Sequence, residues 1–179
     1  GLSRFVLFKE IKRVDLVDLT FLKSGNRDEL LGLEKDEFAD ISRVGKAIVF
    51  SFKKCKKKLI IHLKMTGQLV YFSDKKALIV GGHSEKKSDV SKFNHIRLRF
   101  NFIDGSYLIL NDTRRFAYLK LLDDADFKIF KDKVGVDPLS GSFNINLFLS
   151  FFEKRKKNVK AFLLDQSLVS GIGNIYADE

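Results

Sequence analysis

The sequence predicts an α+β chain with more than one domain, in which a two-layer β-sandwich is followed by the first part of an α-helical domain. Residues 1–122 carry short Val, Ile, Leu and Phe runs separated by Lys, Asp, Gly and Ser clusters, a pattern typical of β structure. Residues 144–179 carry apolar residues at helical spacing instead. Residues 123–143 contain the only proline, Pro138, among Gly, Ser and Asp, and are interpreted as a linker.

A β-hairpin is the clearest of the expected elements. Apolar and polar residues alternate strictly from His95 to Phe102, Asp104-Gly105 supplies a turn, and residues 107–110 return along the first strand. Because side chains alternate across a strand, one face of this hairpin packs inward. The other face presents His95, Arg97 and Arg99.

Runs that are apolar on both faces identify further strands. Such runs suit a two-layer sandwich, and they comprise Ala47 to Phe52, Leu59 to Leu63 and Leu69 to Phe72. The lysine-rich run from Lys53 to Lys58 lies between two of them, and we interpret it as a solvated loop rather than a specific contact. Residues 27–38 mix acidic residues with leucines and could form a helix, although Gly32 interrupts the period.

Spacing and capping residues predict three helices near the end of the chain. Apolar residues at i, i+3, i+4 and i+7 between Ile145 and Phe152 predict an amphipathic helix, capped by Ser142 or Asn144. Asn158 can cap a second short helix, and a third is expected to begin at Gly171-Ile172-Gly173-Asn174. In that last element, glycines let backbone amides approach an oxyanion, which the N-terminus of a helix also favours.

Composition bounds the class of function. The chain of 179 residues has 33 Lys and Arg against 23 Asp and Glu, a formal net charge of +10 that predicts an anionic partner. Hydrophobic residues make up 45% of the chain, including 18 Phe, so it can bury a core and is not a disordered basic tail. A single cysteine, Cys55, excludes an internal disulfide and a cysteine-rich zinc site.

Membrane association is not expected. No apolar run approaches the ~18 residues of a membrane span, and no signal peptide is visible at Gly1. We therefore expect a cytoplasmic protein.

Four motifs in chain order resemble the bacterial formamidopyrimidine-DNA glycosylases. The first three are short, whereas the last is long and specific. They are Arg43-Val44-Gly45-Lys46, His62-Leu63-Lys64-Met65-Thr66-Gly67, Asn111-Asp112-Thr113-Arg114-Arg115-Phe116, and Leu164-Asp165-Gln166-Ser167-Leu168-Val169-Ser170-Gly171-Ile172-Gly173-Asn174-Ile175-Tyr176-Ala177. With Gly135-Val136-Asp137-Pro138-Leu139-Ser140, the resemblance spans nearly the whole chain.

The resemblance implies a fold and an activity. The fold is an N-terminal β-sandwich (residues 1–122), a linker (residues 123–143), the beginning of a helix-two-turn-helix domain (residues 144–179) and a zinc finger beyond. The activity is DNA base-excision repair by a bifunctional DNA glycosylase and AP lyase. Such an enzyme flips an oxidised purine, such as 8-oxoguanine or a formamidopyrimidine, out of duplex DNA, attacks the sugar with an N-terminal proline amine, and cleaves the strand through the resulting imine.

The resemblance also implies partners and cofactors. The partner is double-stranded DNA containing damaged bases, bound by a monomer at the bacterial nucleoid. Zinc is expected only in the zinc finger, so this chain should hold no cofactor.

Two departures from the family pattern concern function. The family opens with Pro-Glu, whereas this chain opens Gly1-Leu2-Ser3-Arg4 and has no proline before Pro138. We therefore expect the chain as given to be incomplete and inactive, without its attacking amine. Phe93 stands where many members have a DNA-contacting histidine, so that contact is lost or moved.

By the resemblance, Met65, Arg114 and Phe116 fill the hole that an extruded nucleotide leaves in the base stack. Flipping costs on the order of a few kcal/mol of stacking and pairing, which apolar or planar side chains restore. A thioether and a flat ring replace lost stacking, while a guanidinium can hydrogen-bond the orphaned opposite base. The alternatives are core positions for Met65 and Phe116, and surface ion pairing for Arg114 and for Arg115, the second DNA-binding arginine.

The remaining candidate residues also rest on the resemblance. Lys46 matches a catalytic lysine at the scissile phosphate that takes part in proton transfer. Further DNA contacts are expected from Arg155, Lys160, Asn174 and Tyr176. The alternative for Arg155 is a solvated helix end.

Three other functions stay open. The endonuclease VIII type shares this fold but removes oxidised pyrimidines and usually builds its void-filling wedge from one loop, so the split between Met65 and residues 114–116 favours the purine branch. A non-catalytic homologue could grip damaged DNA without chemistry. A basic RNA-binding protein unrelated to repair is the third.

Overall fold

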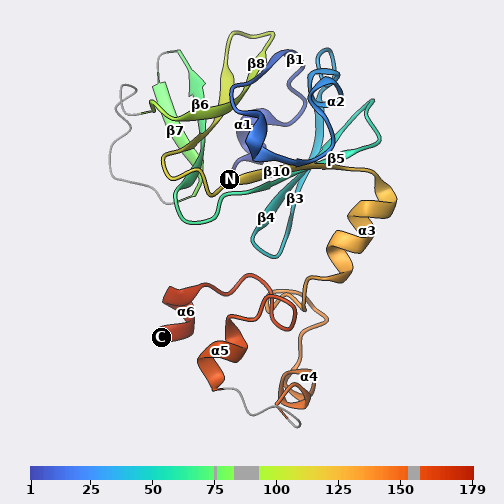
Figure 1. Ribbon diagram of the computed structural model, residues 1–179, viewed down its shortest axis with the longest axis vertical. Coiled ribbons are helices and arrows are strands. Elements are labelled where there is room, and N and C mark those ends of the chain that lie inside the picture. The colour runs from blue at the N-terminus through green and yellow to red at the C-terminus, as the bar shows by residue number, and fades with distance from the viewer. Residues whose placement is uncertain (75, 83–92, 153–157) are drawn as a thin grey trace. The chain divides into compact units, whose positions relative to one another are not determined.

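The computed structural model describes residues 1–74, 76–82, 93–152 and 158–179 (Figure 1). These residues form two compact units. The first unit comprises Gly1–Ser42 and Ala47–Asp124, and the second comprises Arg43–Lys46 and Ala125–Glu179. The predicted fold class is confirmed, because the first unit is built of two sheets and the second is helical.

Two five-stranded sheets make up the β-sandwich, in the strand orders β1-β8-β9-β6-β7 and β2-β10-β5-β4-β3 (Figure 1). The short helices α1 and α2 and one 3-10 turn precede or join these strands. The strands are β1 (Ile11–Leu16), β2 (Leu22–Ser24), β3 (Phe38–Val44), β4 (Ala47–Phe52), β5 (Lys58–His62), β6 (Gly67–Ser73), β7 (Lys76–Gly81), β8 (Ile96–Phe102), β9 (Tyr107–Asp112) and β10 (Tyr118–Leu122); the helices are α1 (Ser3–Val6) and α2 (Arg27–Leu31), and the 3-10 turn spans Leu19–Phe21.

The core of the sandwich lies between the two sheets. Phe38 is fully buried there, and its ring contacts rings from both sheets at centroid distances of 5.1 to 6.0 Å. Its partners are Phe50 and Phe52 on β4 and Phe100 and Phe102 on β8. Aromatic burial of this size dominates the energetics of a core.

The expected hairpin and the three apolar strands are confirmed. β8 pairs with β9 in antiparallel register, and Gly105 takes φ 84° in the turn between them. β4, β5 and β6 cover the three apolar runs. Residues 53–57 of the lysine-rich run form the expected loop between β4 and β5, whereas Lys58 begins β5. The loop is not only solvated, because Lys53 pairs with Glu37 at 2.8 Å and Lys57 pairs with Glu29 at 2.6 Å.

The helix expected over residues 27–38 is shorter than the sequence suggested. α2 begins at a capping box formed by Asn26 and Glu29 and ends at Leu31, with Gly32 as its C-cap. The chain then turns through Lys35, at φ 64°, whose amide donates to the carbonyl of Ile11 at 2.8 Å. Backbone hydrogen bonding to β1 at Ile11 therefore takes the place of further helical turns after Leu31.

The expected linker contains a helix that was not predicted. α3 (Asp124–Asp132) occupies its first part. Two rings one turn apart, Phe127 and Phe130, stack at 6.4 Å on this helix, and acidic residues stand in its first turn, where the helix dipole favours them. Its sequence is polar, so periodicity alone gave a weak signal.

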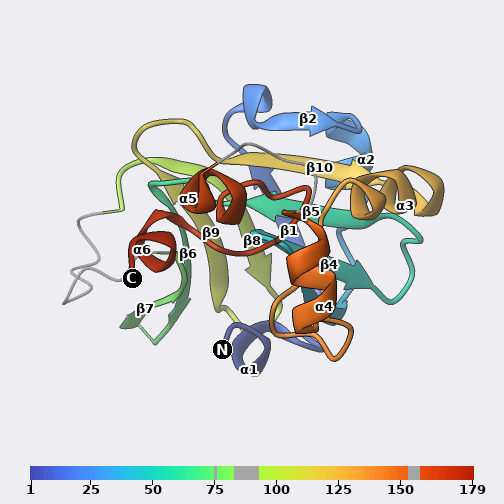
Figure 2. The same cartoon turned by 90° about the horizontal axis from the view of Figure 1, so that it is seen from below.

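The second unit continues with α4 (Ile145–Ser150), α5 (Val159–Leu163) and α6 (Asn174–Asp178) (Figure 2). Of the two caps that the sequence left open for α4, Ser142 and Asn144, the structure has Asn144, which accepts from Leu147 N at 2.9 Å. The predicted cap Asn158 of α5 is confirmed and accepts from Ala161 N at 2.7 Å. Phe162 is the largest buried side chain of this unit's core. The core consists of Phe162, Leu168 and Val169, with Phe148, Phe151, Phe152 and Ile172 packed against them.

Among the described residues, no helix is both long enough and apolar enough to cross a membrane.

Candidate functional site

Two loops of the first unit lie side by side at one end of the sandwich. The 63–66 loop joins β5 to β6, and the 113–117 loop joins β9 to β10. β6 pairs with β9, which places Gly67 opposite Asp112, and β5 pairs with β10, which places His62 opposite Tyr118. Both loops therefore connect the β5–β10 strand pair to the β6–β9 strand pair. The fold brings together the two motifs that carry Met65 and Arg114.

A buried carboxylate, Asp112, connects these loops. Its side chain is fully buried and accepts hydrogen bonds from the Thr66 hydroxyl and, at 2.7 Å, from the amide of Ala117. Its backbone carbonyl accepts from Arg97 Nε at 3.0 Å and Nη2 at 2.9 Å. Because one carboxylate serves a donor from each loop, it fixes their relative position. The sequence motifs contain Asp112 and Thr66, but their partnership was not predicted.

The predicted void-filling side chains point away from the core. Met65 is 66% exposed and Phe116 is 52% exposed, so neither fills the interior of the sandwich. Arg114 is also exposed and has no hydrogen bond or ion pair to the described part of the chain. Large apolar side chains at this exposure are available to a partner. Their insertion into DNA stays a prediction.

Arg115 is held differently from Arg114. Its backbone is left-handed at φ 60°, and its Nη2 lies 2.6 Å from Asp18 Oδ2 and 3.4 Å from the Thr20 hydroxyl. A hydrogen bond from the Thr20 hydroxyl, followed by smaller effects that include the charge of Arg115, lowers the pKa of Asp18. The surface ion pair considered for this arginine is therefore present, and Arg115 braces the loop.

We expect Asp18→Asn to cost at most about 1 kcal/mol at neutral pH, because exposed ion pairs contribute little. The folded-state pKa of Asp18 is lowered, so its contribution is complete above the unfolded pKa, about 3.9, and is lost as pH falls through the folded value. Urea unfolding of both proteins from pH 2 to 7 measures this. A stability difference that persists unchanged at pH 2 would contradict the assignment.

An aromatic pair flanked by lysines lies beside the two loops. The ring of His62 stacks on Tyr118 at 5.2 Å, and the ammonium groups of Lys64 and Lys120 lie 5.5 and 5.7 Å from the Tyr118 ring centre. Burial raises the pKa of Tyr118. Sequence reasoning missed this group, although the alternation of Tyr118 and Lys120 along a strand was a usable signal.

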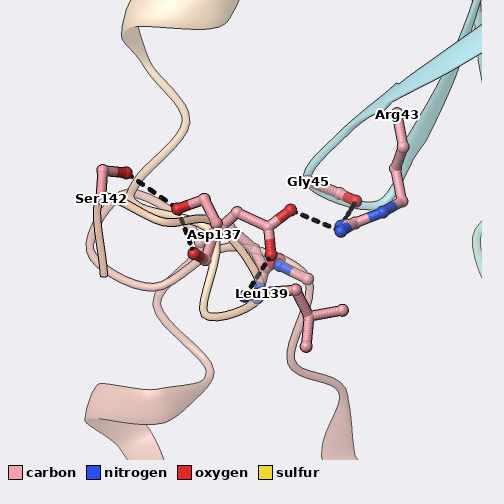
Figure 3. A network of polar contacts seen from close by, with 8 residues as sticks. Arg43, Gly45, Asp137, Leu139 and Ser142 are labelled. Atoms are coloured by element: carbon pink, nitrogen blue, oxygen red, sulfur yellow. Dashed lines mark hydrogen bonds and ion pairs between the residues drawn. The ribbon is translucent and has the colours of Figure 1, made fainter. Parts of the chain in front are cut away.

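In the second unit, Arg43 fastens residues 43–46 to the segment that follows α3 (Figure 3). Its Nη1 donates to the carbonyl of Gly45 at 2.8 Å, and its Nη2 pairs with Asp137. The other carboxylate oxygen of Asp137 accepts from Leu139 N at 3.0 Å. Gly45 has φ 57°, a conformation that favours glycine. Arg43 thus holds the tight turn that precedes Lys46.

Lys46 lies beside the residue that caps the N-terminus of α6. Its Nζ is 3.9 Å from the position that a Cβ on Gly173 would occupy. Lys46 and Tyr176 also line one cavity of about 640 Å³, so the second unit brings these two predicted site residues together. The cavity is lined by Arg43, Gly45, Lys46, Asp137, Pro138, Leu139, Ser170, Gly171, Ile172 and Tyr176.

Gln166 shapes the loop that leads into α6. Its Nε2 donates to the carbonyls of Leu164 at 3.1 Å and Ile172 at 3.0 Å, and its Oε1 accepts from Gly171 N at 3.0 Å. Asn174 follows as an exposed first residue of α6, with Gly173 as the N-cap. Gln166 in this motif therefore holds the loop through internal hydrogen bonds.

The other two predicted contacts differ in status. Lys160 on α5 forms an ion pair with Asp178 on α6, and both side chains are about half exposed, at 50% and 56%. Arg155 lies outside the described residues. Within the described ranges, no three His, Cys, Asp or Glu side chains come together to hold a metal ion.

Comparison with known proteins identifies both parts of the chain. The family model described as the formamidopyrimidine-DNA glycosylase N-terminal domain matches residues 1–119, and the model of the H2TH domain of the same enzymes matches residues 134–179. The chain belongs to the formamidopyrimidine-DNA glycosylase family. Within this family, it is 32% identical over 181 aligned residues to the Streptococcus pneumoniae serotype 4 enzyme and 34% identical over 181 to that of Mycoplasma pneumoniae.

Formamidopyrimidine-DNA glycosylase structures are also similar in fold. The Lactococcus lactis Fpg in complex with DNA containing an abasic site matches 99% of this chain with a TM-score of 0.80 and 27% identity. The complex of the same enzyme with DNA containing N7-benzyl-Fapy-dG matches equally well, at a TM-score of 0.80. The chain spans 60% of the length of the two curated relatives and of the first of these structures.

Proposed function

We propose that this chain carries the DNA-gripping and base-flipping surfaces of a base-excision repair enzyme, a bifunctional DNA glycosylase and AP lyase that removes oxidised purines from duplex DNA. The observation that carries the proposal is the pair of neighbouring loops that expose Met65 and Phe116 and are joined by the buried carboxylate of Asp112. The relatives' names and the damaged DNA in the Lactococcus lactis complexes support it. In a bacterial cell the protein would act as a monomer on the nucleoid.

The chemistry of the loops suits the filling of a vacated base position. Met65 supplies a flexible, polarisable side chain and Phe116 a flat ring, and both can replace stacking that is lost when a nucleotide leaves the duplex. The guanidinium fork of Arg114, which has no hydrogen bond or ion pair to the residues that the structure describes, can donate two hydrogen bonds to the orphaned base. Because the wedge comes from two loops, we favour oxidised purines over oxidised pyrimidines as the lesion class.

Phosphate contacts are assigned to the second unit. Lys46, Asn174 and Tyr176 are exposed around the loop that begins α6, and the chain carries a net charge of +10. We assign Lys46 to the scissile phosphate, where its ammonium group can also transfer a proton during strand cleavage. Attack on the sugar requires an N-terminal proline amine, which residues 1–179 do not supply, so no covalent step is assigned to their side chains.

The wedge assignment is tested with fluorescence-labelled duplexes that contain an abasic site opposite each of the four bases. We expect Arg114→Gln to erase the preference for the opposite base, because that variant loses the guanidinium fork. The matched control Arg27→Gln removes an exposed arginine on α2 and should leave the preference intact. Equal losses of binding affinity for damaged and undamaged duplexes would contradict the void-filling role of Arg114.

The phosphate assignment is tested by the salt dependence of binding. Lys46→Gln should weaken binding to all duplexes and reduce the slope of log K against log salt by about 0.9, the value for one phosphate contact. Lys56→Gln, an exposed lysine in the loop between β4 and β5, is the matched control and should leave the slope unchanged. An unchanged slope in the Lys46 variant would overturn the contact.

Lyase activity has its own test. A longer protein that carries Pro-Glu ahead of Gly1 should be trapped covalently by borohydride on DNA with an abasic or 8-oxoguanine site. Binding of lesion DNA without any trapping would favour the non-catalytic damaged-DNA-binding homologue. Equal competition by single-stranded RNA would favour the RNA-binding alternative.

A further inference from the structure

A second cavity, lined mainly by cationic side chains, lies on the outward face of β1 and β8. Arg99 and Asn101 line it and alternate along β8 with the buried Leu98, Phe100 and Phe102, so they face away from the sandwich core. The cavity has a volume of about 350 Å³, which is within the range of small-molecule sites. Its lining residues are Lys12, Arg13, Asp15, Arg99 and Asn101, three cations and one carboxylate.

The carboxylate in this cavity is already satisfied. Asp15 Oδ1 lies 2.5 Å from Arg13 Nη2, and Asp15 Oδ2 accepts from Asn101 Nδ2 at 2.8 Å. Arg13 and Asp15 therefore neutralise each other. The side chains of Lys12 and Arg99 have no hydrogen bond or ion pair within the described ranges, so the cavity keeps two cations without an anionic partner.

Arg99 is fixed in place by aromatic stacking. Its guanidinium carbon lies 3.9 Å from the ring centre of Tyr107, and that ring stacks on the buried Phe72 at 4.5 Å and 11°. Stacking of this kind orients a guanidinium before any ligand arrives. A fixed cation loses little conformational freedom when it binds.

Arg99 also carries an unused donor. Its Nε is buried, and in the described part of the chain it is the single buried side-chain nitrogen or oxygen without a hydrogen-bond partner. Buried donors in folded proteins are nearly always satisfied by protein, water or ligand. The orphaned Nε therefore marks a place where an acceptor belongs.

We propose that this cavity binds a phosphate group, with Arg99 and Lys12 as its ligands. An arginine fork and a lysine ammonium together match the charge and the several acceptor oxygens of a tetrahedral oxyanion. The volume exceeds that of a phosphate alone, which leaves room for an ester substituent. The phosphate can come from a nucleic-acid strand that passes β8 or from a free phosphate or nucleotide. The site does not depend on the 63–66 and 113–117 loops.

The test follows the Nε–H signal of Arg99 by NMR in the chain of residues 1–179, assigned by its loss in Arg99→Lys. Inorganic phosphate, added at constant ionic strength, should shift this signal to saturation. Lys12→Gln should weaken the response at least about threefold, because one of the two charges is removed. Lys56→Gln changes the net charge equally and should leave it unaltered.

Three results would overturn the site: a shift that never saturates, an equal response to acetate, or equal effects of Lys12→Gln and Lys56→Gln. A second titration with undamaged duplex DNA in phosphate-free buffer identifies the source. A saturable Arg99 shift with DNA that added inorganic phosphate moves to the phosphate-bound position supports DNA as the ligand, and a response to inorganic phosphate without any response to DNA supports a free phosphate group. If the void-filling role of Arg114 fails its own test, the Arg99 responses to inorganic phosphate and to undamaged duplex DNA should still be observed.

Discussion

Replacement of Asp112 by alanine should lower the free energy of unfolding of the first unit by about 3 kcal/mol, because hydrogen bonds to a charged group contribute about 1.5–3 kcal/mol and buried donors left unpaired cost about 1–3 kcal/mol. The carboxylate is fully buried and serves both the Thr66 hydroxyl and the Ala117 amide. The variant removes both acceptors at once. Urea unfolding, combined with hydrogen exchange resolved by peptide, measures the loss and locates it.

A graded control separates the network from simple side-chain removal. Thr66→Val keeps the shape of that side chain but deletes one of the two hydrogen bonds to Asp112, so it should cost about 1 kcal/mol. In the alanine variant, exchange should rise in both the 63–66 and 113–117 loops. Equal destabilisation by the two variants, or faster exchange in one loop alone, would show that Asp112 does not couple them.

Local patterns were enough to predict most of the sandwich. The strict alternation from His95 to Phe102 and the Asp104-Gly105 turn specify a hairpin within one short stretch, and the structure has it. Asn158, and Asn144 as one of two candidates, could be predicted as caps because a cap and the amides it serves are close in sequence. Features that depend on residues close together along the chain, such as turns and helix caps, could therefore be predicted from the sequence.

Partnerships across the chain were beyond that reasoning. Arg115 and Asp18 are 97 residues apart, and Arg43 and Asp137 are 94 apart, so only the folded topology shows that they meet. The sequence left surface ion pairing open for both Arg114 and Arg115, whereas in the described residues only Arg115 forms an ion pair and braces the loop. A charged residue's role follows from its partner.

Helix ends were the other source of error. α2 stops at Leu31 because Lys35 and Asp36 form backbone hydrogen bonds with Ile11, at 2.8 and 2.7 Å. Tertiary pairing overrode a weak helical pattern. α3 was missed for the opposite reason, since its few apolar residues gave little periodicity in a segment dominated by charges.

Phe162→Ala should have the largest effect of any substitution considered, a loss of about 4 kcal/mol in the second unit, because truncation of a buried phenylalanine leaves a cavity. The side chain is 1% exposed and stacks on Phe152 at 4.2 Å. Its loss should release Val169, and with it the parallel bridge to Val136 that holds the start of the Gln166 loop. Hydrogen exchange should then rise throughout residues 134–179.

The matched control is Tyr176→Ala, which removes an aromatic side chain of the same unit that is 76% exposed and should change stability by no more than about 0.5 kcal/mol. Both variants should weaken DNA binding, but for different reasons. Tyr176→Ala should weaken binding by a protein that stays folded, whereas Phe162→Ala should weaken it through unfolding, so that cooling partly restores binding. Unchanged hydrogen exchange in residues 164–174 of Phe162→Ala would show that the core around Phe162 does not position Gly171 and Gly173. The assignment of Lys46 to a DNA phosphate would then lose its structural support.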